Sequence, residues 1–316
     1  MAWLKLLRFP NIFTLCADVL MAWFLVQTAF PISGLPEFIA AFCVAGVSSG
    51  LLYWAGMVLN DVHDYEEDCK LRPERPLPSG EITREKARRV GFLLLGLGFV
   101  GMFAASFWSF SLGWTMLCVV LLTLCVFAYN TRLKNTWFGP VLMGLCRGLN
   151  VFTLMSFAPL KLWLPLMPGL VMVPLALAVY ICGVTLYSRG ETEREPGQDP
   201  PFIVPFFAVL TMVFGLTLLW TFPQSLPDDR VSPLLLAQPW RWMVLLGLLM
   251  AWLFFRCLLS VLQGPLAVRR MMKPAIFMVF ILDAAVTFAV ADLRMAVVIL
   301  VLMIPAVLTG RVISST

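Results

Sequence analysis

The sequence has 316 residues, of which 60% are hydrophobic and 13% are charged, and its mean hydropathy is +0.89. This composition excludes a soluble globular domain with a polar surface. The net charge of +5 does not indicate a nucleic-acid partner, because the positions of the Lys and Arg residues follow membrane topology. Backbone polar groups in lipid must be hydrogen-bonded within the protein, so long apolar runs without period-2 alternation predict an all-α protein of the lipid bilayer.

Apolar runs of spanning length predict about ten transmembrane helices, with nine as the alternative. They cover roughly residues 11–31, 37–59, 88–110, 112–130, 136–158, 166–187, 201–222, 237–262, 273–291 and 293–312. Only the sequence ADLR joins the last two, so they form a tight hairpin, or one of them is re-entrant or interfacial. The first run follows Lys5 and Arg8 and has no small-residue cleavage site, so we expect a retained helix.

The basic residues between the runs predict the orientation of the chain. They lie at the amino terminus and in segments 60–89, 130–135, 187–195 and 267–273, which strict alternation places on one side. Cytoplasmic loops hold the excess of Lys and Arg, so we expect these segments in the cytoplasm and the protein in a bacterial inner membrane. The eight cysteines lie mostly in apolar runs and form no C-x-x-C pair, which predicts small buried hydrophobic residues.

The second run ends in an acidic motif, Asn60, Asp61, Asp64 and Asp68. On a continuing helix, steps of three and four residues place the three carboxylates on one face. They repel one another unless a cation neutralises them, and hard oxygen ligands of this kind suit Mg²⁺. The alternative is a solvated acidic helix end. His63 points away from its motif neighbours, so it flanks the site and is not its base.

A basic group follows the acidic motif directly. Lys70, Arg72 and Arg75 are suited to phosphate oxygens, which arginine can bind through two hydrogen bonds. Acidic residues for a metal followed by basic residues for phosphate predict a site for a magnesium diphosphate.

The strings NDVHDYEED and RPERPLPSGEIT together resemble the first signature of the UbiA superfamily of intramembrane prenyltransferases. The resemblance covers roughly residues 5–200. It includes LRFPN with Asn11, NTRLKN with Arg132 and Lys134, and CRGLN with Arg147 and Asn150. It implies a single UbiA-like membrane domain over residues 1–316, with motif loops at about 60–89 and 187–200. Arg147 lies inside an apolar run, where a charge is costly, so we interpret it as a partner of the acidic cluster or of the diphosphate. Asp283 and Arg256 also lie within apolar runs, but snorkelling or a local ion pair accounts for them equally well, so they are left outside the site.

The second polar loop, LYSRGETEREPG, departs from the family's second signature, which carries aspartates. Glu191 and Glu195 keep the i to i+4 spacing, and Tyr187 and Arg189 precede them. Arg189 is the candidate for the basic residue that usually precedes the first carboxylate. The string YSRGE resembles the EboC-like branch of the family. The alternative is a surface loop of mixed charge.

The resemblance implies a magnesium-dependent transfer of an isoprenyl group from a prenyl diphosphate to a small aromatic or lipophilic acceptor. In this hypothesis the acidic motif binds one Mg²⁺, and Glu191 and Glu195 bind a second. The substrate-binding residues are Asn11, Asn60, Arg72, Arg75, Arg132, Lys134, Arg147, Asn150, Tyr187 and Arg189. The alternative is a UbiA-like carrier, transporter or assembly component that binds a lipid diphosphate without turnover. A transporter unrelated to diphosphates is a third hypothesis, although transporter sites usually lie at the bilayer midplane.

Overall fold

The computed structural model describes residues 1–29, 36–159, 167–192 and 203–313, and in these residues all regular secondary structure is helical. The predicted all-α class is therefore confirmed. The α-helices are α1 (Ala2–Leu6), α2 (Ile12–Ala29), α3 (Pro36–His63), α4 (Tyr65–Leu71), α5 (Arg84–Ala105), α6 (Leu112–Ala128), α7 (Gly139–Met155), α9 (Met167–Thr192), α10 (Ile203–Thr217), α11 (Pro233–Ala237), α12 (Trp240–Gln263), α13 (Pro265–Val290), α14 (Leu293–Val301) and α15 (Met303–Val312).

Eight helical segments of the described residues are long and apolar enough to cross a membrane, which makes the chain a multi-span membrane protein. The shorter apolar helices α7 and α10 occupy the positions of two further predicted spans. The last predicted span consists of α14 and α15, which meet at Leu302. The predicted start of the ninth span at residue 273 was wrong, because α13 begins at Pro265 and includes the basic segment that we expected to be a connection.

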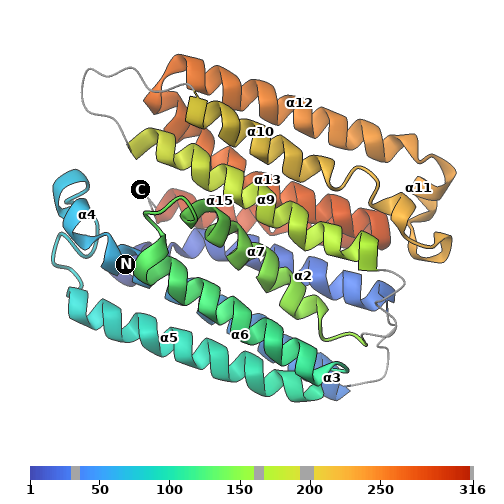
Figure 1. The fold of residues 1–316 in the computed structure, drawn as a ribbon, viewed down its shortest axis with the longest axis horizontal. Coiled ribbons are helices and arrows are strands. Elements are labelled where there is room, and N and C mark those ends of the chain that lie inside the picture. Colours follow the sequence, from blue (N-terminus) through green and yellow to red (C-terminus); the bar gives the residue numbers. More distant parts are fainter. Residues whose placement is uncertain (30–35, 160–166, 193–202, 314–316) are drawn as a thin grey trace.

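The spanning helices lie side by side along the long axis of the molecule (Figure 1). Helices α3, α5 and α6 form one edge, α10 and α12 form the other, and α2 packs against α7 and α13 between them. Helix α4, the amino terminus and the carboxyl end of α9 lie at the same end of the bundle (Figure 1). The two polar loops identified in the sequence therefore begin at one end of the molecule.

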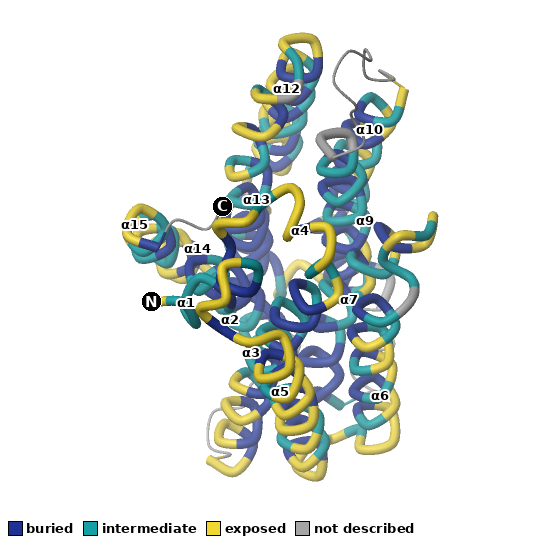
Figure 2. The backbone as a smooth tube through the Cα atoms, turned by 90° about the vertical axis from the view of Figure 1, so that its left-hand side faces the viewer, coloured by how far each residue is buried: buried dark blue, intermediate teal, exposed yellow. Residues whose placement is uncertain are grey.

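One continuous hydrophobic core connects the helices, and it includes Met21, Leu52 and Phe280. Helices α7 and α9 approach backbone to backbone, because a Cβ on Gly148 would lie 2.6 Å from the carbonyl oxygen of Pro174. Small residues at helix interfaces allow this close packing in membranes. The outer turns of α5, α6 and α12 are exposed (Figure 2) and carry apolar side chains, as expected for surfaces that contact lipid.

The acidic motif lies where α3 ends and α4 begins. Asp64 lies between the two helices, so the continuing helix on which the three carboxylates would share one face is interrupted there. Nevertheless, the Asp64 amide donates to the Asn60 carbonyl at 3.0 Å, and the Asp68 amide donates to the Asp64 carbonyl at 2.8 Å. The four-residue spacing of helical hydrogen bonds therefore continues across the interruption and keeps the motif side chains close together.

Candidate functional site

A cavity of about 470 Å³, here called the main cavity, lies between α2, α3, α6, α7, α9 and α13. Ten of the predicted site residues line it, although they come from five separate sequence segments. They are Asn11, Asn60, Asp64, Asp68, Arg72, Arg75, Lys134, Arg147, Asn150 and Arg189. The same cavity has an extensive apolar wall, which includes Leu52, Leu122, Val126, Ile181, Val184, Met272 and Ile276.

The other predicted residues are placed differently. Asp61 is buried beside the cavity but does not line it. Tyr187 does not line it either, because its hydroxyl points towards α12 and hydrogen-bonds Ser260 and the Cys257 carbonyl oxygen. The structure does not describe the side chains of Arg132 and Glu191, and all of Glu195 lies outside the described residues. The metal-binding role of the two glutamates therefore stays a prediction.

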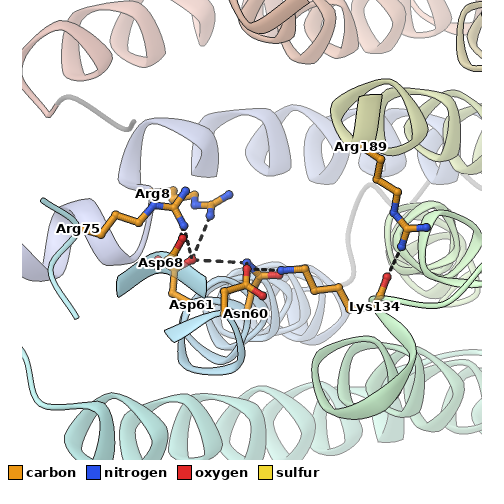
Figure 3. Close-up of polar contacts among 8 residues, drawn as sticks. Arg8, Asn60, Asp61, Asp68, Arg75, Lys134 and Arg189 are labelled. Carbon is orange, nitrogen blue, oxygen red and sulfur yellow. Dashed lines mark hydrogen bonds and ion pairs between the residues drawn. The ribbon is translucent and has the colours of Figure 1, made fainter. Parts of the chain in front are cut away.

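Two arginines neutralise the first and last carboxylates of the acidic motif (Figure 3). The Arg75 guanidinium donates to Asp68 at 2.6 Å and lies 4.0 Å from Asp61. Arg8 donates to Asp61 at 3.0 Å, and the Asp61 charge raises the pKa of Arg8 above its usual value. Arg8 has a left-handed backbone, with φ of 45°, which is uncommon for a residue with a side chain and is often found at functional sites.

The central carboxylate of the motif has a different partner. Lys134 forms an ion pair with Asp64, and the Asn60 side-chain amide donates to the same carboxylate at 3.3 Å. Arg189, at the end of α9, donates to the carbonyl oxygens of Lys134 and, at 3.0 Å, Thr136. Figure 3 shows Arg189 reaching from α9 to this connection. Residues from both polar regions of the sequence thus meet through the segment that carries Lys134.

Arg147 binds a carboxylate that the sequence interpretation missed. It forms an ion pair with Asp18 of α2, and it donates to the Thr14 hydroxyl at 3.2 Å and to the Thr14 carbonyl oxygen at 2.8 Å. One of our two interpretations made Arg147 a partner of the acidic motif. In this structure Arg147 does not pair with that motif. Its partner Asp18 is fully buried, and Arg147 also lines the main cavity.

Several cavity residues were not among the predicted site residues. Ser49 donates to the Asn150 side-chain oxygen at 2.5 Å, and Asn130 and Glu67 also line the cavity. Arg8 was part of a quoted motif, and Asp18 was a single acidic residue within an apolar run, which is a usable signal because charges are rare there. Asn130 and Glu67 lie within the quoted strings NTRLKN and NDVHDYEED but were given no role, whereas Ser49 is an ordinary residue of a membrane helix that only the packing identifies.

The oxygen donors of the cavity fit a magnesium ion that arrives with a diphosphate. In the described residues, no group of three or more His, Cys, Asp or Glu side chains is arranged to hold a metal ion by itself. However, Asn60, Asp64 and Asp68 supply hard oxygen ligands to the same cavity. Mg²⁺ typically uses one or two protein carboxylates and completes its coordination with water and substrate phosphates. This donor set therefore suits a shared metal–diphosphate site.

Comparison with known proteins identifies related sequences. The model of the UbiA prenyltransferase family matches residues 13–282 of this chain. A digeranylgeranylglyceryl phosphate synthase of Sulfolobus acidocaldarius is 32% identical over 154 residues, which cover 48% of this chain and 50% of the relative. The enzyme of the same name from Methanocaldococcus jannaschii is 34% identical over 98 residues, or 31% and 32% of the two chains. The chain thus spans about half the length, or less, of these curated relatives.

Solved structures share the fold over nearly the whole chain. A structure from work on digeranylgeranylglyceryl phosphate synthase in membranes has a TM-score of 0.59 at 19% identity, and the match covers 93% of this chain and 98% of the other. A UbiA homologue from Archaeoglobus fulgidus has a TM-score of 0.52 at 13% identity, with 95% and 100% coverage. At these identities the likeness shows the fold.

Proposed function

The chain belongs to the UbiA prenyltransferase family, and from this premise we propose that it is a magnesium-dependent membrane enzyme that transfers an isoprenyl group from a prenyl diphosphate. One observation carries the proposal. The main cavity joins a polar region, with six basic and three acidic side chains, to an apolar wall. A prenyl diphosphate has the same division between a charged head and an apolar chain.

The polar region would hold the diphosphate and its metal. Asp64, Asp68 and the Asn60 side-chain oxygen would hold Mg²⁺, which when bound neutralises charge on the leaving diphosphate. Arg72, Lys134 and Arg147 line the same cavity and would bind phosphate oxygens. Arg8 and Arg75 hold Asp61 and Asp68 in position through ion pairs. Fixed charges in a site shielded from bulk water would stabilise the departure of the diphosphate.

The apolar wall would hold the prenyl chain and keep water from the reacting carbon. Leu122 and Val126 of α6 face the cavity with Ile181 and Val184 of α9. A UbiA homologue of the same fold, with a TM-score of 0.50 at 14% identity and 93% and 99% coverage, is bound to DMAPP and Mg²⁺. That complex supports the class of donor and metal proposed for this chain.

For the acceptor we propose a lipophilic molecule. The names of the matching relatives refer to a glyceryl phosphate lipid, which favours a lipid over an aromatic acceptor. We also propose that the end of the bundle that carries α4 faces the cytoplasm, because the basic connections gather there.

The test is release of inorganic diphosphate by purified protein that is incubated with DMAPP, geranyl or geranylgeranyl diphosphate, with lipid extract as acceptor, and with Mg²⁺ or EDTA. An enzyme releases diphosphate only with metal and forms a prenylated product detectable by mass spectrometry. The existing ion pairs of Asp61, Asp64 and Asp68 with Arg and Lys favour a second candidate, a protein that binds the lipid diphosphate without turnover. Equilibrium binding without diphosphate release from any donor would support this second candidate.

A further inference from the structure

A second cavity of about 510 Å³, here called the lateral cavity, lies where α3, α5 and the turn after α6 meet. Leu59, Val62 and His63 line it from α3. Successive residues of a helix are about 100° apart, so the centre of this face lies about 120° around the helix axis from the side chains of Asn60 and Asp64. The two cavities therefore open on different sides of the helix that leads into the acidic motif.

The rim of the lateral cavity is basic. Arg84 and Arg88 line it from the first turns of α5, beside His63. Arg84 contacts Glu66 at 3.5 Å, but the two side chains are 45% and 84% exposed, so this ion pair competes weakly with another anion. The acidic side chain of the rim, Glu85, forms an ion pair with Arg89 at 2.5 Å. The rim thus presents two guanidinium groups to an incoming anion.

Below the rim the wall is apolar and opens towards lipid. Phe92, one turn further along α5, lines the cavity and is 43% exposed. The exposed side chains of Leu93, Leu97 and Val100 form an apolar surface on the neighbouring face of α5. Candidate spans end at His63 in α3 and begin at Arg84 in α5, which places the basic rim at the boundary between membrane and water.

We propose that the lateral cavity binds an anionic phospholipid, with its phosphate between Arg84 and Arg88 and an acyl chain along Phe92 and the exposed face of α5. Charge complementarity selects the headgroup, and the continuous apolar surface selects a lipid over a free anion. Basic clusters at the ends of membrane helices attract anionic lipids in this way. This inference does not depend on the proposed prenyltransferase activity.

The lateral cavity has a direct contact with the main cavity through Asn130, which lines both. Its side chain is buried and donates to the Val126 carbonyl oxygen at 2.8 Å, while its own oxygen has no hydrogen-bond partner among the residues that the structure describes. The proposed lipid is a resident ligand and not the acceptor, because Arg84, Arg88 and Phe92, which would hold it, do not line the main cavity with the proposed donor site. Its bound phosphate would hold the ends of α3 and α5 together beside the acidic motif.

The test measures phospholipid binding to the full chain purified in detergent, by native mass spectrometry and by thermal stabilisation. The probes are phosphatidylglycerol, phosphatidylcholine and inorganic phosphate. We expect phosphatidylglycerol to bind and stabilise the wild type more strongly than phosphatidylcholine. The double variant Arg84→Gln/Arg88→Gln should bind phosphatidylglycerol about tenfold or more weakly, since two charge-assisted hydrogen bonds are lost.

Lys86→Gln is the matched control. Lys86 is an exposed residue of the same helix that does not line the lateral cavity, so its loss should leave phosphatidylglycerol binding close to that of the wild type. Equal losses in Lys86→Gln and the double variant would indicate general surface attraction and overturn the proposal. It would also be overturned if inorganic phosphate bound as tightly as phosphatidylglycerol, or if Phe92→Gln bound phosphatidylglycerol as the wild type does. Circular dichroism of each variant verifies that it is folded.

Discussion

Lys134 donates to the carboxylate of Asp64, so a cation from the connection between α6 and α7 neutralises the centre of an acidic motif that lies 70 residues earlier in the chain. The same carboxylate is one of the ligands proposed for Mg²⁺. Lys134 also lines the main cavity, where an incoming diphosphate would compete with Asp64 for its ammonium group. A metal ion bound to Asp64 would release Lys134 to the phosphate.

Replacing Lys134 should therefore change metal binding and donor binding in opposite directions. In Lys134→Met, Mg²⁺ or Mn²⁺ alone should bind more tightly, because the competing cation is absent. With saturating metal, a non-hydrolysable prenyl diphosphate analogue should bind about tenfold more weakly, because one charged contact to phosphate is lost. Titration calorimetry measures both affinities. Lys70→Met, an exposed residue outside the main cavity, is the control, and a parallel change in both affinities would contradict this role of Lys134.

The buried pair of Asp18 and Arg147 should behave as a unit in unfolding measurements. Loss of one partner leaves the other charge unpaired in the membrane, which costs about 3–5 kcal/mol. Asp18→Leu and Arg147→Met should each lower the free energy of unfolding by this amount. The double variant should be closer to the wild type, and unfolding in mixed micelles with increasing SDS measures the cycle. Purely additive losses would show that the two charges do not stabilise each other.

The sequence predicted most of the fold because a long apolar run in a membrane protein must satisfy its backbone hydrogen bonds within itself, which only a helix does. It placed the start of α13 too late, since the basic residues Arg269, Arg270 and Lys273 resemble a connection although a helix end at the membrane surface can carry them. Composition does not define where a helix ends at that surface.

The candidate site was predicted where its residues follow each other along the chain. Asn60, Asp64, Asp68, Arg72 and Arg75 form one local pattern, and the structure places all five on the main cavity. The partners of these residues were not predictable in the same way. The pairing of Asp18 with Arg147 joins residues 129 positions apart, and it depends on which faces of α2 and α7 meet. Periodicity within one helix contains no information on that choice.

Because α7 and α9 approach closely, we expect replacement of a glycine between them to lower the free energy of unfolding more than replacement of a glycine with open space around it. In Gly148→Ala the new Cβ would meet the Pro174 carbonyl oxygen and the Ala178 Cβ, so separation of the helices should cost about 1–3 kcal/mol. Gly96→Ala in α5 has open space around its Cβ and should change the free energy of unfolding by less than about 1 kcal/mol. Thermal unfolding of both variants measures the difference, and equal stabilities would contradict the packing of α7 against α9.

Cys69 offers a test of the proposed orientation with a natural label. It is an exposed residue of α4, next to Asp68. A membrane-impermeant maleimide should therefore label it in inside-out vesicles but not in intact cells, and Cys69→Ser should lose that label. Labelling from the outside of intact cells would place the acidic motif on the opposite side of the membrane.

The glutamates of the second polar loop are the sharpest test between the enzyme and the binding protein. Helix α9 continues to Thr192, so the Glu191 backbone lies in its last turn, two residues beyond Arg189, which lines the main cavity. A metal held there would matter most as charge accumulates on the leaving diphosphate, so Glu191→Gln should lower turnover by about 100-fold and change donor binding much less. Diphosphate release and equilibrium binding are measured for each variant. Glu193→Gln is the neighbouring control, and Glu191→Asp restores the usual family residue with a shorter reach. If Glu191→Gln changes neither turnover nor binding, the second polar loop is a surface segment and the acidic motif alone must support the metal chemistry.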